Sequence, residues 1–178
     1  THWRPRAFHP VLWMSETAQF SPGKAIRGGI PVCWPWFGPH PADPAAKAHG
    51  FARTSSWQVR HTGLLPDGAA QVLLALTSDS ASRALWPHDF ALELDIRAGR
   101  TLSVVLRTHN RSDAPIRITE ALHTYLAIGD VRESTISGLD GVEYIDQLRD
   151  HARVVEDNDA LGFAGETDRI YQTARGCV

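Results

Sequence analysis

The alternation of apolar and polar side chains in the middle of the chain constrains the fold more than any other feature. Residues 90–97 read FALELDIR, with an apolar side chain at every second position. That pattern is typical of a β-strand with one buried face. Residues 101–110 alternate in the same way after a Gly-containing break. The two stretches therefore predict a β-hairpin.

Further short strands are predicted on both sides of this hairpin. Residues 57–62 and 71–77 predict a second pair around a Gly/Pro/Asp turn, and short strands are expected at 116–122, 131–136 and 141–144. Helical periodicity is scarce, and a single short helical piece is predicted at 81–85, ended by Pro87. Many short strands separated by turn residues favour an all-β, antiparallel β-sandwich. We expect one domain over residues 1–178.

Composition excludes some classes of function. The chain has 178 residues, 43% of them apolar and 21% charged, with a net charge of −2. The chain lacks the excess of basic residues that would indicate a nucleic-acid partner. No apolar run is long enough to cross a membrane. The first residues show no leader pattern, which favours a cytoplasmic protein. Cys33 and Cys177 could in principle pair and show no metal-ligand spacing, and the cytosolic character of the chain favours two free thiols.

Two blocks of residues combine glycine, proline and aromatic side chains with arginine. Residues 26–38 read IRGGIPVCWPWFG and residues 49–53 read HGFAR. Glycines let the backbone approach a ligand, and aromatic faces suit the C–H groups of a sugar ring. Arginine offers forked donors to a phosphate or carboxylate. The blocks indicate a lined binding pocket, or else a loop that caps the end of a β-sandwich with its rings buried.

These blocks belong to an ordered set that carries a family resemblance. The others are WPHDF at 86–90, EALHTYL at 120–126, ISGL at 136–139 and TDRIY at 167–171. The set resembles the signature blocks of the D-hexose-6-phosphate mutarotases, the glucose-6-phosphate 1-epimerase branch of the aldose 1-epimerase superfamily. The resemblance implies a galactose-mutarotase-like β-supersandwich. It also implies a cytoplasmic isomerase that interconverts the α and β anomers of hexose 6-phosphates without a cofactor or a metal.

The resemblance assigns roles to five residues. Anomer interconversion needs a base for the C1 hydroxyl and an acid for the ring oxygen. His123 matches the family's acid, and histidine titrates near neutral pH. Arg27 and Arg53 match residues that bind the 6-phosphate or sugar hydroxyls, and His49 and Asp168 match residues that contact hydroxyls. The partner implied is a small hexose 6-phosphate.

Each of these residues also has a purely structural interpretation. His123 could be a surface or packed histidine, the arginines could pair with nearby carboxylates, His49 could order its loop and Asp168 could be a turn residue. Trp36 and Phe37 could form an apolar wall or belong to the core. His88 and Asp89 are predicted to be structural.

One family feature has no match in the sequence. The resemblance implies a general-base glutamate on a strand well beyond the TDRIY block, and Glu166 lies in a different block. It also implies strands before the region of Trp3. We therefore expect a chain truncated at both ends and an incomplete sandwich, whose open sheet edges favour association. The alternative function is a non-catalytic, sugar-phosphate-binding β-sandwich that lacks the base.

Overall fold

The computed structural model describes residues 2–5 and 7–172, which form strands, turns and very little helix. The chain divides into two compact units, unit 1 over Thr1–Ala127 and unit 2 over Ile128–Val178. Every strand ladder is antiparallel, which confirms the all-β class. A single domain over the whole chain stays a prediction.

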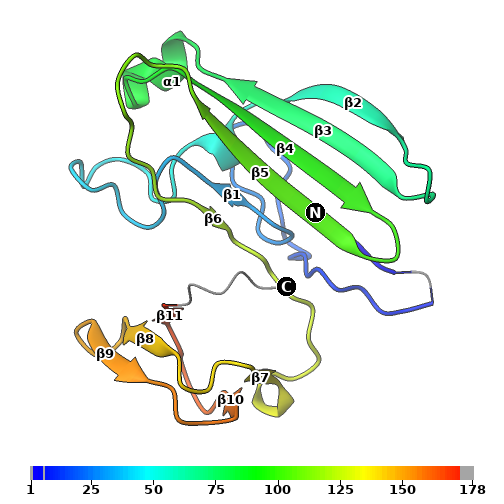
Figure 1. The fold of residues 1–178 in the computed structure, drawn as a ribbon, viewed down its shortest axis with the longest axis vertical. Helices are drawn as coiled ribbons and strands as arrows, with labels where there is room; N and C mark the ends of the chain where they lie inside the picture. Colours follow the sequence, from blue (N-terminus) through cyan, green and yellow to red (C-terminus); the bar gives the residue numbers. More distant parts are fainter. Residues whose placement is uncertain (1, 6, 173–178) are drawn as a thin grey trace. The chain divides into compact units, whose positions relative to one another are not determined.

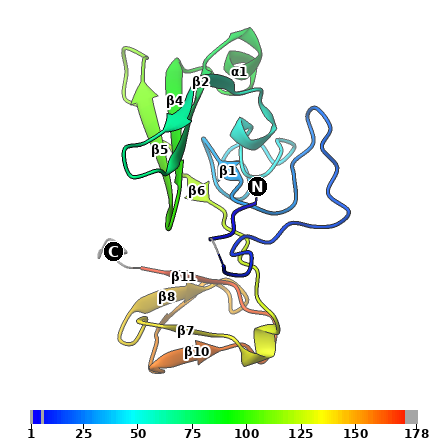
Figure 2. The same ribbon diagram turned by 90° about the vertical axis from the view of Figure 1, so that its right-hand side faces the viewer.

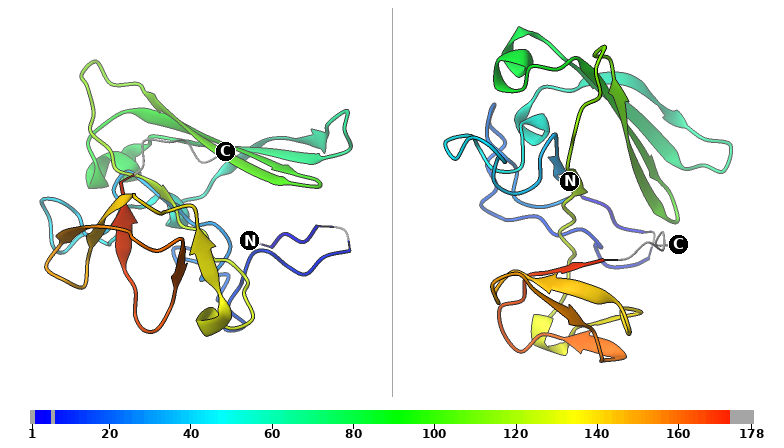
Figure 3. Two further views of the ribbon diagram at one scale, coloured as in Figure 1. Left: turned by 60° about the horizontal axis from the view of Figure 1, so that its bottom comes forward. Right: turned by 60° about the vertical axis from the view of Figure 1, so that its left-hand side comes forward.

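The largest element of unit 1 is a four-stranded sheet in the order β2-β3-β4-β5 (Figure 1; Figure 3 shows it from two more sides). Its strands are β2 (Gln58–Leu64), β3 (Ala70–Thr77), β4 (Phe90–Ala98) and β5 (Leu102–Asn110). Strands β4 and β5 pair from Phe90↔Asn110 to Ala98↔Leu102, which confirms the predicted hairpin. Strands β2 and β3 confirm the second pair.

The connection from β3 to β4 contains α1 (Ser80–Leu85), where the short helix was predicted. Asp79 caps this helix, because its carboxylate accepts from the backbone N–H of Ser82 while the Ser82 hydroxyl accepts from the N–H of Asp79. Asp89 then accepts hydrogen bonds from Ser78 and Arg83. Asp89 thus fixes the entry to β4, in agreement with the structural role predicted for it.

The core of unit 1 lies against one face of the sheet. The fully buried Trp34 ring is 4.5 Å from the ring of Phe90 and 5.1 Å from that of Trp86, centroid to centroid. Leu92 and Leu94 of β4 join the same cluster, together with Val32, Trp36, Phe51 and Ala52. The alternation along β4 therefore directs every second side chain into this cluster.

Strand β1 (Val32–Cys33) pairs with β6 (Ala121–Leu122) beside this core (Figure 2). A longer strand was predicted at 116–122, and only its last two residues form one. The N–H of Thr119 donates to Pro35 and that of His123 donates to Pro31. Proline has no N–H to return, so the ladder is interrupted on both sides of β1. The short 3₁₀ helix η1 (Ala52–Thr54) follows later in the chain.

Unit 2 contains two small sheets, ordered β11-β8-β9 and β10-β7 (Figure 2). The strands are β7 (Thr135–Ser137), β8 (Glu143–Asp146), β9 (Ala152–Val155), β10 (Ala160–Gly162) and β11 (Arg169–Tyr171). The strand predicted at 131–136 begins instead with a 3₁₀ turn, η2 (Val131–Glu133). Asp130 causes this difference, because its side chain accepts from the N–H of Arg132 and its carbonyl from that of Glu133.

A buried carboxylate organises unit 2. Glu156 is 2% exposed and accepts hydrogen bonds from Tyr171 at 2.6 Å, Asn158 at 2.7 Å and Arg169 at 2.9 Å. The hydrogen bond from Tyr171 lowers the pKa of Glu156, and Asn158 and the charge of Arg169 lower it further against the effect of burial. Arg169 also lies 4.4 Å above the ring of Tyr144. Two residues of the TDRIY block therefore hold this carboxylate ionised.

No helix within residues 2–5 and 7–172 is long and apolar enough to cross a membrane.

We predict that Gly50→Ala destabilises unit 1 far more than a typical surface substitution. Gly50 has a φ of +65°, and a Cβ built there lies 2.0 Å from the carbonyl oxygen of Trp34. The strained φ alone costs about 1–2 kcal/mol, and the backbone clash raises the expected loss in unfolding free energy to about 2–4 kcal/mol. Urea denaturation measures it. Gly68→Ala is the matched control, since Gly68 has a φ of +83° in open space. Equal losses in the two variants would contradict the close approach of Gly50 to Trp34.

Candidate functional site

Three distant segments of unit 1 meet in a closed ring of backbone hydrogen bonds. The N–H of Trp13 donates to the carbonyl of Tyr125 at 2.9 Å, that of Tyr125 to Gly29 at 2.9 Å, and that of Gly29 to Trp13 at 2.8 Å. Gly29 has a φ of +68°, a conformation that residues with a Cβ rarely adopt. The ring fixes Trp13, the RGGIP block and the EALHTYL block against one another. We call it the three-residue junction.

The junction places His123 on an exposed face. His123 and Tyr125 are two residues apart in an extended segment, so both side chains lie on the same side of it. Leu122 points the other way and packs against the core. The side chain of His123 is exposed, and its ring centroid is 5.1 Å from that of Tyr125. An exposed imidazole at this position is free to reach a ligand.

His49 is held by both backbone polar groups of Gly38. The N–H of His49 donates to the carbonyl of Gly38 at 2.8 Å, and the N–H of Gly38 donates to Nδ1 of His49 at 3.1 Å. An Nδ1 that accepts a hydrogen bond leaves the proton of the neutral ring on Nε2. His49 therefore offers an N–H donor from Nε2. Its φ of +67° is uncommon outside glycine, and such a conformation persists only where the surroundings enforce it.

The rings of Phe37, His49 and His123 form a small cluster, which we call the ring cluster. Phe37 is 5.0 Å from His49 and 6.2 Å from His123, and the two imidazoles are 6.2 Å apart. Phe37 is 42% exposed, whereas Trp36 is 7% exposed and donates its indole N–H to the carbonyl of Lys47. Phe37 therefore forms an apolar wall beside the histidines, and Trp36 belongs to the core.

Arg53 adds positive charge next to this cluster. One of its terminal nitrogens donates to the carbonyl of Ala48 at 2.9 Å, and its buried Nε–H has no hydrogen-bond partner among the described residues. Burial lowers the pKa of His49, and the charge of Arg53 and then that of His123 lower it further. Burial raises the pKa of Cys33, against the effect of Arg53. Cys33 is a free, buried thiol, and Cys177 lies outside the described residues.

Arg27 lies next to the junction. Its carbonyl accepts from the N–H of Ser15 at 3.0 Å, and Gly28 and Gly29 follow it directly. Its side chain is exposed. A Cβ on Gly28 would lie 2.6 Å from backbone atoms of Trp13 and Met14, so only glycine permits the close packing of these segments. The residues on either side of Arg27, Ile26 and Gly28, line the same cavity as Arg53.

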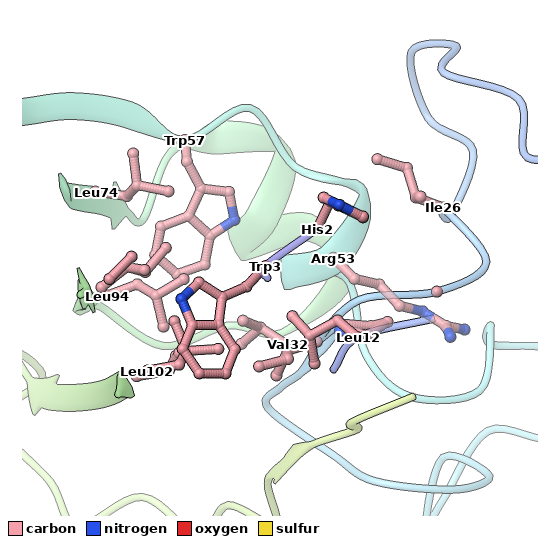
Figure 4. Close-up of a pocket in the computed structure, with 16 residues that line it drawn as sticks. His2, Trp3, Leu12, Ile26, Val32, Arg53, Trp57, Leu74, Leu94 and Leu102 are labelled. Atoms are coloured by element: carbon pink, nitrogen blue, oxygen red, sulfur yellow. The ribbon is translucent and has the colours of Figure 1, made fainter. Parts of the chain in front are cut away.

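That cavity is a gap of about 260 Å³ inside unit 1, and its lining is mostly apolar. Figure 4 shows Trp3, Trp57, Leu74 and Leu94 around it, with the guanidinium of Arg53 on the far side from the leucines. His49 and His123 do not line it. Its apolar walls offer little to a hydroxyl-rich ligand, so we place the candidate site at the ring cluster rather than in the cavity.

Asp168 lies in unit 2, whereas the other four predicted site residues lie in unit 1. It borders a second pocket, of about 220 Å³, with Asp146, Glu166 and Arg169 among its neighbours. The Asp168 carbonyl accepts from the N–H of Gln147 at 2.9 Å, and its side chain is exposed. The polar pocket suits hydroxyl groups, and a role for Asp168 in sugar binding stays a prediction.

Unit 1 thus brings His49 and His123 together around Phe37, with the charge of Arg53 acting on His49 and with Arg27 next to the junction. No role was predicted from the sequence for Trp13 or Tyr125, whose rings continue from this cluster. The sequence could have indicated Tyr125, because it lies two residues after His123 and so projects to the same side of an extended segment. Trp13 could not be found this way, because only the fold brings it opposite Tyr125. Among the described residues no group of three His, Cys, Asp or Glu side chains could hold a metal ion.

Comparison with known proteins agrees with this fold. Residues 1–176 match the family described as Aldose 1-epimerase, and the chain belongs to that family. The chain is 39% identical to a protein of Escherichia coli (strain K12) and 36% identical to one of Salmonella typhimurium (strain LT2). Both carry the name "Putative glucose-6-phosphate 1-epimerase", and each match covers 98% of this chain and 57% of the relative. The chain therefore spans little more than half the length of these relatives.

A solved structure shows the same fold. The crystal structure described as "a putative mutarotase (YeaD) from Salmonella typhimurium" matches with a TM-score of 0.88 at 36% identity. The match covers 96% of this chain and 55% of that chain. The β-sandwich fold expected from the sequence is confirmed.

We predict that His49 takes up a proton less readily than a free histidine, and that its neutral ring carries the proton on Nε2. Burial, Arg53 and His123 all lower its pKa, so protonation should require a pH below the ordinary value of about 6.5. Because the unfolded chain binds this proton more readily, His49 lowers folding stability as the pH falls through that range. Two-dimensional ¹H–¹⁵N NMR of the imidazoles reports both the tautomer and the pKa, and His49→Ala assigns the signal. A proton on Nδ1, or a pKa above that of free histidine, would show that Gly38 and Arg53 do not control this ring.

Proposed function

We propose that this protein interconverts the α and β anomers of hexose 6-phosphates, with the site at the ring cluster. The observation that carries the proposal is the pairing of an exposed histidine, His123, with a second histidine held as a neutral donor, His49. The family to which the chain belongs and the names of its relatives support the same reaction. The ligand class is a small sugar phosphate, and a cytoplasmic location is part of this proposal.

The two histidines differ in the way that the reaction needs. In the proposed reaction protonated His123 gives its proton to the ring oxygen as the C1–O5 bond breaks, and a base takes the proton of the C1 hydroxyl. C1 then becomes an aldehyde carbon, and rotation about C1–C2 followed by the reverse transfers closes the other anomer. Burial and then the charge of Arg53 lower the pKa of His49, which favours the neutral ring, whose Nε2–H can hold a sugar hydroxyl.

Arg27 and Arg53 supply the charge for the 6-phosphate. Both guanidiniums stay charged at any working pH. Their terminal nitrogens can donate charge-assisted hydrogen bonds to an anionic ligand oxygen. The exposed side chain of Arg27 can close on the same phosphate from the neighbouring glycine-rich segment.

The general base is the part of the mechanism that stays open to experiment. Asp146, Glu166 and Asp168 are the carboxylates of unit 2 that border its polar pocket. A chain that binds hexose 6-phosphates without accelerating their anomerisation would be the non-catalytic alternative. Binding and rate therefore need separate measurements.

We expect glucose 6-phosphate to bind this chain at least about tenfold more tightly than glucose, because charge-assisted hydrogen bonds contribute roughly 1.5–3 kcal/mol each. Arg27→Ala should remove most of that preference. Isothermal titration calorimetry with both sugars measures it. Arg60→Ala is the matched control, since Arg60 is an exposed arginine on β2, outside the site. Equal affinity for the two sugars would refute the phosphate assignment.

For catalysis we expect His123→Ala to slow anomerisation by about a hundredfold or more while leaving affinity for glucose 6-phosphate nearly unchanged, the usual result of losing a general acid. Exchange NMR between the two anomer signals measures the rate at equilibrium. His109→Ala serves as the control, because His109 is an exposed histidine on β5 that pairs with Glu93. A parent chain no faster than water, with affinity intact, would favour the non-catalytic alternative. Full activity in His123→Ala would make His123 structural.

A further inference from the structure

Two aromatic rings continue the ring cluster beyond His123. The centroid of Tyr125 is 5.1 Å from that of His123, and the centroid of Trp13 is 5.8 Å from that of Tyr125 with the two planes 30° apart. Trp13 is 42% exposed. Neither ring belongs to the hydrophobic core of unit 1. Burial in the core therefore does not explain why large aromatic side chains stand at these two positions.

The backbone fixes these two rings in place. Trp13 and Tyr125 lie directly opposite each other, beside the antiparallel bridge Leu12↔Leu126, and both belong to the three-residue junction. Directly opposite residues of antiparallel segments project to the same face, which accounts for the stacked rings. His123 projects to that face as well, since it is two residues from Tyr125. The result is a continuous row of rings from Phe37 to Trp13 on one exposed face.

Such a row suits a ligand with one apolar face and several hydroxyls. The C–H face of a pyranose can rest on exposed aromatic surface, and aromatic contacts of this kind contribute roughly 0.5–1.5 kcal/mol. A tyrosine hydroxyl both donates and accepts, so that of Tyr125 can pair with a sugar hydroxyl. A hexose that reaches His123 with its ring oxygen is also within reach of Tyr125.

We propose that Trp13 and Tyr125 form an aromatic platform that binds the C–H face of the hexose ring and selects cyclic sugar phosphates over other phosphates. This inference rests on the proposed function, because it takes the ligand to be a hexose 6-phosphate bound next to His123. The arginines recognise the phosphate, and the platform recognises the ring. The platform therefore contributes to affinity only when the ligand carries a pyranose.

Paired ligands separate the two contributions. We would titrate the chain with glucose 6-phosphate and with glycerol 3-phosphate, an acyclic monophosphate of the same charge. Trp13→Ala should weaken the binding of glucose 6-phosphate by about five- to tenfold, which is the effect of losing one aromatic contact. It should change the affinity for glycerol 3-phosphate by less than about twofold. Trp13→Phe should restore most of the affinity. Saturation-transfer NMR with irradiation of the aromatic protons should give signals on the sugar C–H protons that weaken in Trp13→Ala.

The controls guard against an indirect effect through the junction. Phe20→Ala removes an aromatic side chain that is 70% exposed and lies outside the ring row, and it should change neither affinity. The platform proposal would be overturned if Trp13→Ala weakened the binding of both ligands equally, or if it left the affinity for glucose 6-phosphate unchanged.

Arg27→Ala distinguishes this failure from failure of the proposed function. That variant should weaken the binding of glucose 6-phosphate and of glycerol 3-phosphate to a similar extent. If the parent chain bound neither phosphate, the proposed function would fail and the platform with it.

Discussion

The closed ring of hydrogen bonds among Trp13, Gly29 and Tyr125 is the constraint on which the candidate site depends. Each residue donates to one partner and accepts from the other, so no segment can shift without breaking two of the three bonds. The ring joins residues that are up to 112 positions apart in sequence, from 13 to 125. Gly29 makes it possible, because its φ of +68° turns the backbone so that its N–H and carbonyl reach different segments.

The second constraint is the close approach of Gly50 to the backbone of Trp34. The side chain of Trp34 is fully buried in the core, while its carbonyl accepts from the N–H groups of Phe51 and Ala52. One residue thus anchors the HGFAR block to the core through its ring and through its backbone. His49 directly precedes Gly50, so this anchoring also restrains His49. The N–H of Gly38 donates to Nδ1 of His49 and thereby sets its tautomer. The position of His49 therefore follows from the packing of Trp34 in the core and from the hydrogen bonds to Gly38.

Local patterns allowed the sequence to predict much of the fold. The hairpin of β4 and β5 was evident because apolar residues at every second position favour one register. The interrupted segment before β6 was not evident, because the interruption comes from Pro35 on a different segment. Trp13 was not predicted for the same reason, since only the fold shows that it lies next to Tyr125. The roles of Arg27, His49, Arg53 and His123 came from resemblance, and the structure adds how backbone groups hold two of them.

The two histidines of the candidate site stand in different environments. His49 is partly buried, lies beside Arg53 and accepts a hydrogen bond on Nδ1, and all three features favour the neutral ring. The side chain of His123 is exposed, on the face that carries Tyr125 and Trp13. The backbone of Gly38 thus fixes the donor that the proposed reaction assigns to His49, and exposure leaves His123 within reach of a ligand for the proposed proton transfer.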